Sequence, residues 1–134
     1  GLVSILNIIS NDFEKRKEGV IIGISSVAGD RGRGSNYIYG SSKSGFTSYL
    51  SGLRNRLNKS GVKVITIKPG FIKTKMTNHL DLPKVLTASS DDISKDIINS
   101  INRDKNIIYT KWFWKWIMLI IRITPESFFK KLNF

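Results

Sequence analysis

The sequence contains no cysteine, and this absence excludes disulfide bonds, zinc–thiolate sites and cysteine nucleophiles. Its single histidine, His79, argues against a histidine metal centre and against a Ser-His-Asp triad. The first residues lack the charged, apolar and small-residue regions of a signal peptide. We therefore expect a protein of a reducing compartment, the cytoplasm, that works without a bound metal.

Acidic residues are also scarce. The chain has 10 Asp and Glu but 22 Lys and Arg, which gives a formal net charge of +12. A basic surface attracts nucleic acid, anionic lipid or phosphorylated substrates. The cations are spread along the chain and form no recognition motif, which argues against nucleic acid as a partner. With 134 residues, 40% of them hydrophobic, the chain can bury one modest core.

Helical and strand patterns alternate along the chain. Helical patterns cover residues 2–18, 37–58 and 91–102, and short apolar runs typical of strands cover 19–25, 62–67 and 106–110. Pro69 should stop the second strand. This alternation predicts a parallel α/β sheet with right-handed crossovers, which forms one half of a doubly wound fold and leaves one sheet edge open.

The spacing of Ser26, Tyr39 and Lys43 indicates acid–base chemistry on a carbonyl. Tyr39 opens the long helical segment, and Lys43 follows it at i+4 on the same helix face. A phenol alone is a poor proton donor at neutral pH, and a nearby ammonium group favours the phenolate. Ser26 ends the preceding strand, where its hydroxyl can bond the same substrate oxygen. Tyr37 is a weaker candidate because its i+4 partner is Ser41.

These residues resemble the short-chain dehydrogenase/reductase family over residues 1–77, through Ile24-Ser25-Ser26-Val27-Ala28-Gly29, Tyr39-Gly40-Ser41-Ser42-Lys43 and Lys68-Pro69-Gly70. The resemblance implies a Rossmann-type fold that uses NADH or NADPH to reduce a ketone. It makes Ser26, Tyr39 and Lys43 catalytic. It assigns cofactor binding to Tyr39, Lys43, Pro69, Gly70, Ile72 and Thr74.

The family's glycine-rich loop, Asn-Asn-Ala-Gly segment and catalytic asparagine are absent from this sequence. The resemblance therefore implies that residues 1–110 are the C-terminal half of the domain and that the nucleotide-binding half precedes Gly1. We do not expect this piece to be stable and active alone. In the family, the helices at 2–17 and 37–58 commonly pair with their copies in a dimer. Leu50, Leu53 and Leu57 give one of them an apolar stripe for this contact.

Each site residue also has a structural interpretation. Ser26 could satisfy backbone groups, as we expect of Ser25, while Tyr39 could pack on the core and Lys43 could be solvated. The Pro-Gly segment could be an ordinary turn. The small residues Gly40, Ser41 and Ser42 favour the catalytic interpretation, because they let a cofactor approach the helix closely.

The loop containing Arg31 and Arg33 lies between Ser26 and Tyr39, so both arginines are candidate substrate ligands. Within the family, Ser-Ser-Val-Ala-Gly-Asp-Arg-Gly-Arg and Pro-Gly-Phe-Ile-x-Thr-x-Met look most similar to decaprenylphosphoryl-2-keto-ribose reductases, which act on a polyprenyl-phosphate keto sugar. An arginine can hold a phosphate bidentately. The alternatives are an Asp30–arginine pair that shapes the loop, and a general 3-oxoacyl or small-ketone reductase.

Residues 111–134 form an amphipathic tail that holds all three tryptophans. It is too short and too charged to span a bilayer, which takes about 20 apolar residues. Its aromatic residues and flanking cations suit a helix at the headgroup boundary, so we expect peripheral attachment to the cytoplasmic membrane face. The alternatives are a substrate lid or a dimer contact. A truncated, non-catalytic interaction fragment remains a separate possibility.

Overall fold

The computed structural model describes residues 1–73 and 83–132. Its main sheet has three parallel strands in the order β1-β2-β5, formed by Val20–Ile24, Lys63–Pro69 and Ile107–Thr110. The helices are α1 (Leu2–Arg16), α2 (Tyr37–Leu57), α3 (Ser90–Asn102), α4 (Phe113–Ile123) and α5 (Glu126–Phe129). The smaller elements are 3₁₀ turns η1 (Val27–Gly29), η2 (Asn58–Ser60) and η3 (Lys84–Leu86), and the paired strands β3 (Phe71–Ile72) and β4 (Thr87–Ala88). The predicted parallel α/β fold is confirmed.

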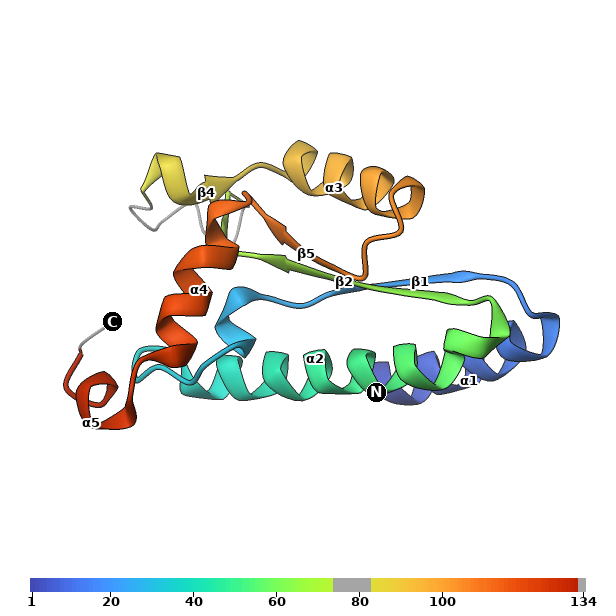
Figure 1. Cartoon of the computed structure of the whole chain (residues 1–134), viewed down its shortest axis with the longest axis horizontal. Coiled ribbons are helices and arrows are strands. Elements are labelled where there is room, and N and C mark those ends of the chain that lie inside the picture. The colour runs from blue at the N-terminus through green and yellow to red at the C-terminus, as the bar shows by residue number, and fades with distance from the viewer. Residues whose placement is uncertain (74–82, 133–134) are drawn as a thin grey trace.

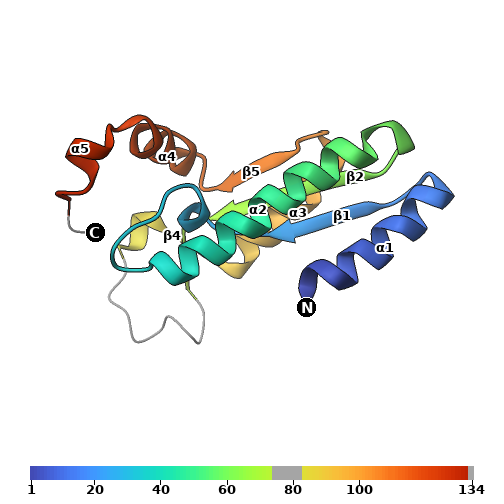
Figure 2. The ribbon, with the colours of Figure 1, turned by 90° about the horizontal axis from the view of Figure 1, so that it is seen from below.

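Helices cover both faces of the main sheet. Figure 1 shows α1 and α2 below the sheet and α3 above it, and Figure 2 shows α1 and α2 side by side from below. The central strand β2 is buried at every residue after Lys63, which explains its nearly continuous apolar sequence. β1 and β5 are the outer strands. Beyond β1 and beyond β5, the described residues add no further strand.

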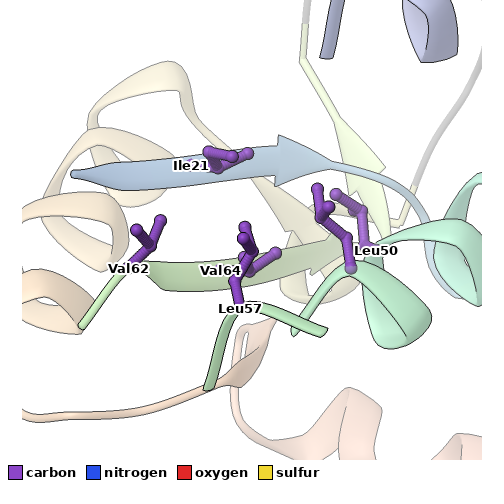
Figure 3. Packing of buried hydrophobic residues seen from close by; sticks show 6 residues of the cluster. Ile21, Leu50, Leu57, Val62 and Val64 are labelled. Carbon is purple, nitrogen blue, oxygen red and sulfur yellow. The ribbon is translucent and has the colours of Figure 1, made fainter. Parts of the chain in front are cut away.

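The main core lies between α2 and the sheet. Ile21 of β1 and Val64 of β2 meet Leu50, Leu53 and Leu57 of α2 (Figure 3). Gly23 admits the Leu50 side chain, since a Cβ at that position would overlap it. Burying one leucine of this kind stabilises the fold by about 1.5–3 kcal/mol.

One expectation about these elements is wrong and another is confirmed. The leucine stripe of α2 is no dimer contact, because Leu50 and Leu57 are fully buried against the sheet of the same chain. The expectation that β2 stops at Pro69 is confirmed, since Pro69 is the last residue of the strand and lies in register with Thr110. A proline is compatible with extended backbone but offers no N–H to a neighbouring strand, so it suits the last position of β2.

Local signals set the helix ends. α2 gives way to η2 and then to Gly61, whose φ of 73° is the left-handed conformation that glycine adopts without strain. α3 begins with a capping box in which the Ser89 hydroxyl accepts from the Asp92 N–H and the Asp92 carboxylate accepts from the Ser89 N–H. The bond from the Ser89 N–H, followed by the interaction of the carboxylate with the Ser89 side chain, lowers the pKa of Asp92.

The tail packs into the fold through a second core. Trp114 and Met118 of α4 are buried against Val27 of η1, and Phe71 meets the Trp114 ring edge-on with centroids 5.7 Å apart. The Trp114 indole N–H donates to the Leu86 carbonyl at 3.2 Å. The inner side of α4 is therefore part of the folded core.

Candidate active site

The predicted catalytic residues gather at the carboxyl ends of β1 and β2. In open parallel sheets, ligands bind at this edge. Ser26 follows β1 and caps η1, and its hydroxyl accepts from the Ala28 N–H at 3.1 Å. The same hydroxyl is 3.4 Å from the Pro69 carbonyl, to which it donates. Ser26 thus links the end of β1 to the Pro-Gly segment after β2.

Tyr39 and Lys43 lie one turn apart at the start of α2. The Lys43 ammonium is 5.7 Å from the centre of the Tyr39 ring and donates to the Ile24 carbonyl at 3.2 Å. This bond brings the ammonium to the end of β1, two residues before Ser26. Tyr39 is 50% exposed, so its ring is accessible to a ligand.

Ser25 has the structural role that was expected of it. Its hydroxyl lies 2.6 Å from the Thr47 hydroxyl and donates to the Lys43 carbonyl at 3.1 Å. Because it is buried and bonded to α2, it fixes the catalytic helix relative to β1. Of the two serines, Ser26 is therefore the one whose hydroxyl belongs to the candidate site.

The small residues of this region serve packing within the protein. A Cβ at Gly40 would lie 2.9 Å from the Ala28 carbonyl oxygen, and one at Gly29 would lie 2.7 Å from the Lys43 backbone. Glycine at both positions lets η1 rest directly on α2. Gly40 is therefore small because the protein's own backbone occupies that space, and the expectation that it is small to admit a cofactor is wrong.

The predicted cofactor residues after β2 follow directly from the strand. Pro69 is its last residue, and Ile72 lies in β3, in register with Ala88. The Trp114 indole fills the space beside Gly70 that a side chain would take. Sequence reasoning missed this contact between the tail and the Pro-Gly segment. Thr74 and His79 lie outside the described residues.

A buried ion pair that the sequence analysis overlooked lies behind the site. The Lys68 ammonium donates to the Asp30 carboxylate at 2.5 Å, with side chains only 6% and 3% exposed. The Tyr109 hydroxyl donates to the other carboxylate oxygen at 2.7 Å. Burial, followed by the bond to and charge of Asp30, raises the pKa of Tyr109, while Arg122 acts in the opposite direction. The sequence signal for this ion pair was Lys68 itself, a charged residue within an apolar strand.

This network overturns the alternative in which Asp30 pairs with an arginine of its own loop. Arg31 instead reaches the tail, donating to the carbonyls of Ile121 at 2.6 Å and Thr124 at 2.5 Å. It also pairs with Glu126 at 2.7 Å. Arg31, predicted as a substrate ligand, is thus committed to contacts within the chain.

Arg33 and Asn36 have hydrogen-bonding capacity left over. Arg33 Nε and Asn36 Oδ1 are buried, and neither has a partner among the described residues. Burial also lowers the pKa of the Arg33 guanidinium. Asn36 also lines a shallow hollow of about 560 Å³, together with Tyr37 and Tyr39, among others. This part of the loop can therefore still contribute polar groups to a ligand.

Within 1–73 and 83–132, no cluster of three or more histidine or acidic side chains is arranged to hold a metal ion. Among the same residues, no helix combines the length and the apolar character that crossing a membrane requires.

Residues 1–84 match the family model for short chain dehydrogenase, so the chain belongs to the short-chain dehydrogenase family. An uncharacterized oxidoreductase of Mycobacterium tuberculosis is 27% identical over 130 residues, which are 97% of this chain and 52% of the relative. The chain thus spans about half the length of the curated relatives it matches.

Solved structures agree on the fold. A short chain dehydrogenase from Burkholderia cenocepacia, in complex with NADP, superposes with a TM-score of 0.77 at 19% identity, over 92% of this chain and 52% of that one. A Tyr-to-Phe variant of ElxO with NADPH bound superposes with a TM-score of 0.71 at 19% identity, over 83% of this chain and 52% of that one. At these identities the likeness establishes the fold alone.

Proposed function

We propose that the complete protein is an NAD(P)H-dependent oxidoreductase that reduces a ketone to an alcohol. The observation that carries this proposal is the position of Lys43 between the Tyr39 ring and the end of β1. A phenol with an ammonium beside it, and a serine hydroxyl at the adjacent strand end, form a proton-donating set for a carbonyl oxygen.

Each side chain has one role in this reaction. Ser26 orients the carbonyl oxygen by donating a hydrogen bond, for which its long 3.4 Å contact with Pro69 would be exchanged. Tyr39 gives its phenolic proton to the developing alkoxide. Lys43 stabilises the resulting phenolate through its positive charge.

The residues present fit a dinucleotide with its nicotinamide end at this site. An ammonium group has three donors, and the bond to Ile24 uses one of those on Lys43. The other two are available to ribose hydroxyls beside Tyr39. Pro69, Gly70, Ile72 and Thr74 would hold the nicotinamide. The bound dinucleotide supplies the hydride. Structural neighbours solved with NADP or NADPH favour this class of cofactor.

A lipid-linked keto sugar, of the polyprenyl-phosphate kind, is the substrate we favour. Arg31 is bound to the tail, whereas Arg33 keeps a buried Nε donor that has no partner among the described residues. The motif resemblance to decaprenylphosphoryl-2-keto-ribose reductases points the same way. A general 3-oxoacyl or small-ketone reductase is the second candidate.

The outer side of the tail suits attachment to a membrane surface. Trp112 is 74% exposed, Ile120 64% and Ile123 69%, and Lys115 lies between the tryptophans. Indole rings and lysines together are typical of helices in the headgroup region. Such attachment would place the active site where a lipid-linked substrate is found.

The test is a turnover assay of the complete protein. NADPH or NADH oxidation would be followed with a polyprenyl-phosphate keto sugar, a soluble ketose and a 3-oxoacyl thioester. We expect oxidation that depends on the keto sugar. Turnover of the thioester alone would favour the second candidate. Failure to bind either dinucleotide would reject the enzyme and leave a non-catalytic interaction protein.

A further inference from the structure

A second cavity lies at the outer edge of β5, away from the hollow beside Tyr39. It has a volume of about 590 Å³, within the range of small-ligand sites, and α3, β5 and α4 line it. Its lining shares no residue with the predicted catalytic or cofactor set. Strands that continue the sheet beyond β1 would lie at the opposite edge, because the order is β1-β2-β5. We call this cavity the β5 groove.

The β5 groove is strongly basic. Its lining includes the cations Lys68, Arg103, Lys105, Lys115 and Arg122 but one carboxylate, Asp96. Lys68 is neutralised by Asp30. Among the described residues, Arg103, Lys105 and Lys115 take part in no ion pair. In the groove lining these three cations are opposed by one carboxylate, Asp96, so the groove keeps a net positive charge.

Two acidic residues that neighbour the groove lining in sequence form ion pairs with lysines outside the lining. Asp104, between Arg103 and Lys105, pairs with Lys63 at 3.2 Å. Asp92, on α3, pairs with Lys111 at 3.3 Å. Because these carboxylates already have cationic partners, the positive potential of the groove is available to an anionic ligand.

Apolar surface adjoins the charges. Trp112, Lys115, Leu119 and Arg122 recur every three or four residues, so one side of α4 presents an indole ring and a leucine together with two cations. Ile107 of β5 adds apolar surface. A cavity that combines cations with an aromatic ring and aliphatic side chains suits a ligand that carries both an anionic group and a hydrocarbon part.

We propose that the β5 groove binds the phosphate group of an anionic amphiphile, at a site separate from the ketone-reducing centre. Arg103, Lys105 and Lys115 contact the phosphate, since charge-assisted bonds to phosphate are strong. Trp112 and Leu119 contact the adjoining hydrocarbon. The inference does not depend on the reductase reaction, because ligand binding here involves neither Tyr39 nor the dinucleotide.

The test is calorimetric titration of the complete protein with dihexanoyl phosphatidic acid, a soluble amphiphile with a phosphate monoester. The groove variant is Lys105→Gln/Lys115→Gln. The matched control is Lys59→Gln/Lys95→Gln, which removes the same charge from exposed residues outside the groove lining. We expect the groove variant to bind roughly tenfold more weakly or worse, and the control to stay within about twofold of wild type.

Two further arms identify the source of the phosphate. Inorganic phosphate is titrated in the same way, and vesicles of phosphatidylcholine with and without phosphatidic acid are tested by sedimentation. A lipid source predicts that the groove variant loses vesicle binding more than the control does. Inorganic phosphate that binds as tightly as the amphiphile would reject the hydrocarbon contact. Equal losses in both variants, or no binding by wild type, would overturn the proposal.

Discussion

The guanidinium of Arg31 lies 3.7 Å from the centre of the Phe129 ring, although the two residues are 98 positions apart. Arg31 belongs to the loop that connects Ser26 to Tyr39, and Phe129 ends α5. The same guanidinium bonds the last carbonyls of α4, where the helix dipole favours a cation. The tail is thereby attached to the loop that separates the two predicted catalytic residues.

We predict that Arg31→Lys destabilises the protein. Lysine keeps the charge but loses the planar fork that bonds several acceptors and stacks on the ring. Hydrogen bonds to charged groups contribute about 1.5–3 kcal/mol, so chemical denaturation should show a loss in that range. Arg16→Lys is the control, because its pair with Asp12 is half-exposed and should change stability by less than about 1 kcal/mol. An equal change in both variants would contradict the role of Arg31.

The elements were predictable from sequence because their signals are local. Short apolar runs predicted the three main strands, and helical spacing of apolar residues predicted the three long helices. Each predicted element lies within a few residues of its observed ends. The pair β3–β4 was missed, since two-residue strands carry no periodicity. The α2 stripe shows a second limit. A pattern reveals that Leu50 and Leu57 form an apolar face, but it does not say whether a sheet or a second copy covers it.

The contacts around the site were less predictable because they join distant positions. Lys68 and Asp30 are 38 residues apart, and Tyr109 and Asp30 are 79 apart. Periodicity contains no information about such pairs. The spacing of Tyr39 and Lys43, in contrast, lies within one helix, so the sequence alone predicted their proximity.

We predict that Lys43→Met in the complete enzyme weakens both dinucleotide binding and turnover. Methionine is of similar length but removes the donors proposed for the ribose and the charge beside Tyr39. Fluorescence titration with NADPH, together with steady-state kinetics, measures the two effects separately. Lys59→Met, at an exposed lysine of η2, is the control. Unchanged dinucleotide affinity in Lys43→Met would count against the ribose contact.

We predict that the complete protein is a dimer in which α1 contributes apolar contacts. Leu2, Ile5 and Ile8 recur at three-residue spacing and are 58%, 57% and 72% exposed, so a helix face is left uncovered by this chain. Two-fold dimers are the commonest closed assemblies. Light scattering at micromolar concentration should give twice the monomer mass for wild type and a shift to monomer for Ile5→Asp/Ile8→Asp. Monomeric wild type would exclude the interface.

We predict that Trp116→Gln/Ile120→Gln releases the complete protein from anionic liposomes. Both residues lie on the exposed side of α4, so their change spares the core, whereas deleting 111–134 would also remove the buried Trp114 and Met118. Activity should fall more on a lipid-linked substrate than on a soluble ketose. Equal losses on both substrates would make the tail a lid or part of the fold. Ile98→Gln, exposed on α3, is the control.

The central claim is that Tyr39 is the proton donor, and a matched pair of variants tests it most directly. Tyr39→Phe deletes the phenolic oxygen and keeps the ring, and Tyr37→Phe does the same two residues earlier. General acid catalysis contributes roughly 10²–10⁴-fold, so steady-state turnover of the complete enzyme should fall by that factor in Tyr39→Phe and stay near wild type in Tyr37→Phe. Dinucleotide affinity should be largely retained in both. Turnover of Tyr39→Phe within about threefold of wild type would contradict the account, since it is less than the roughly 100-fold minimum expected of a general acid.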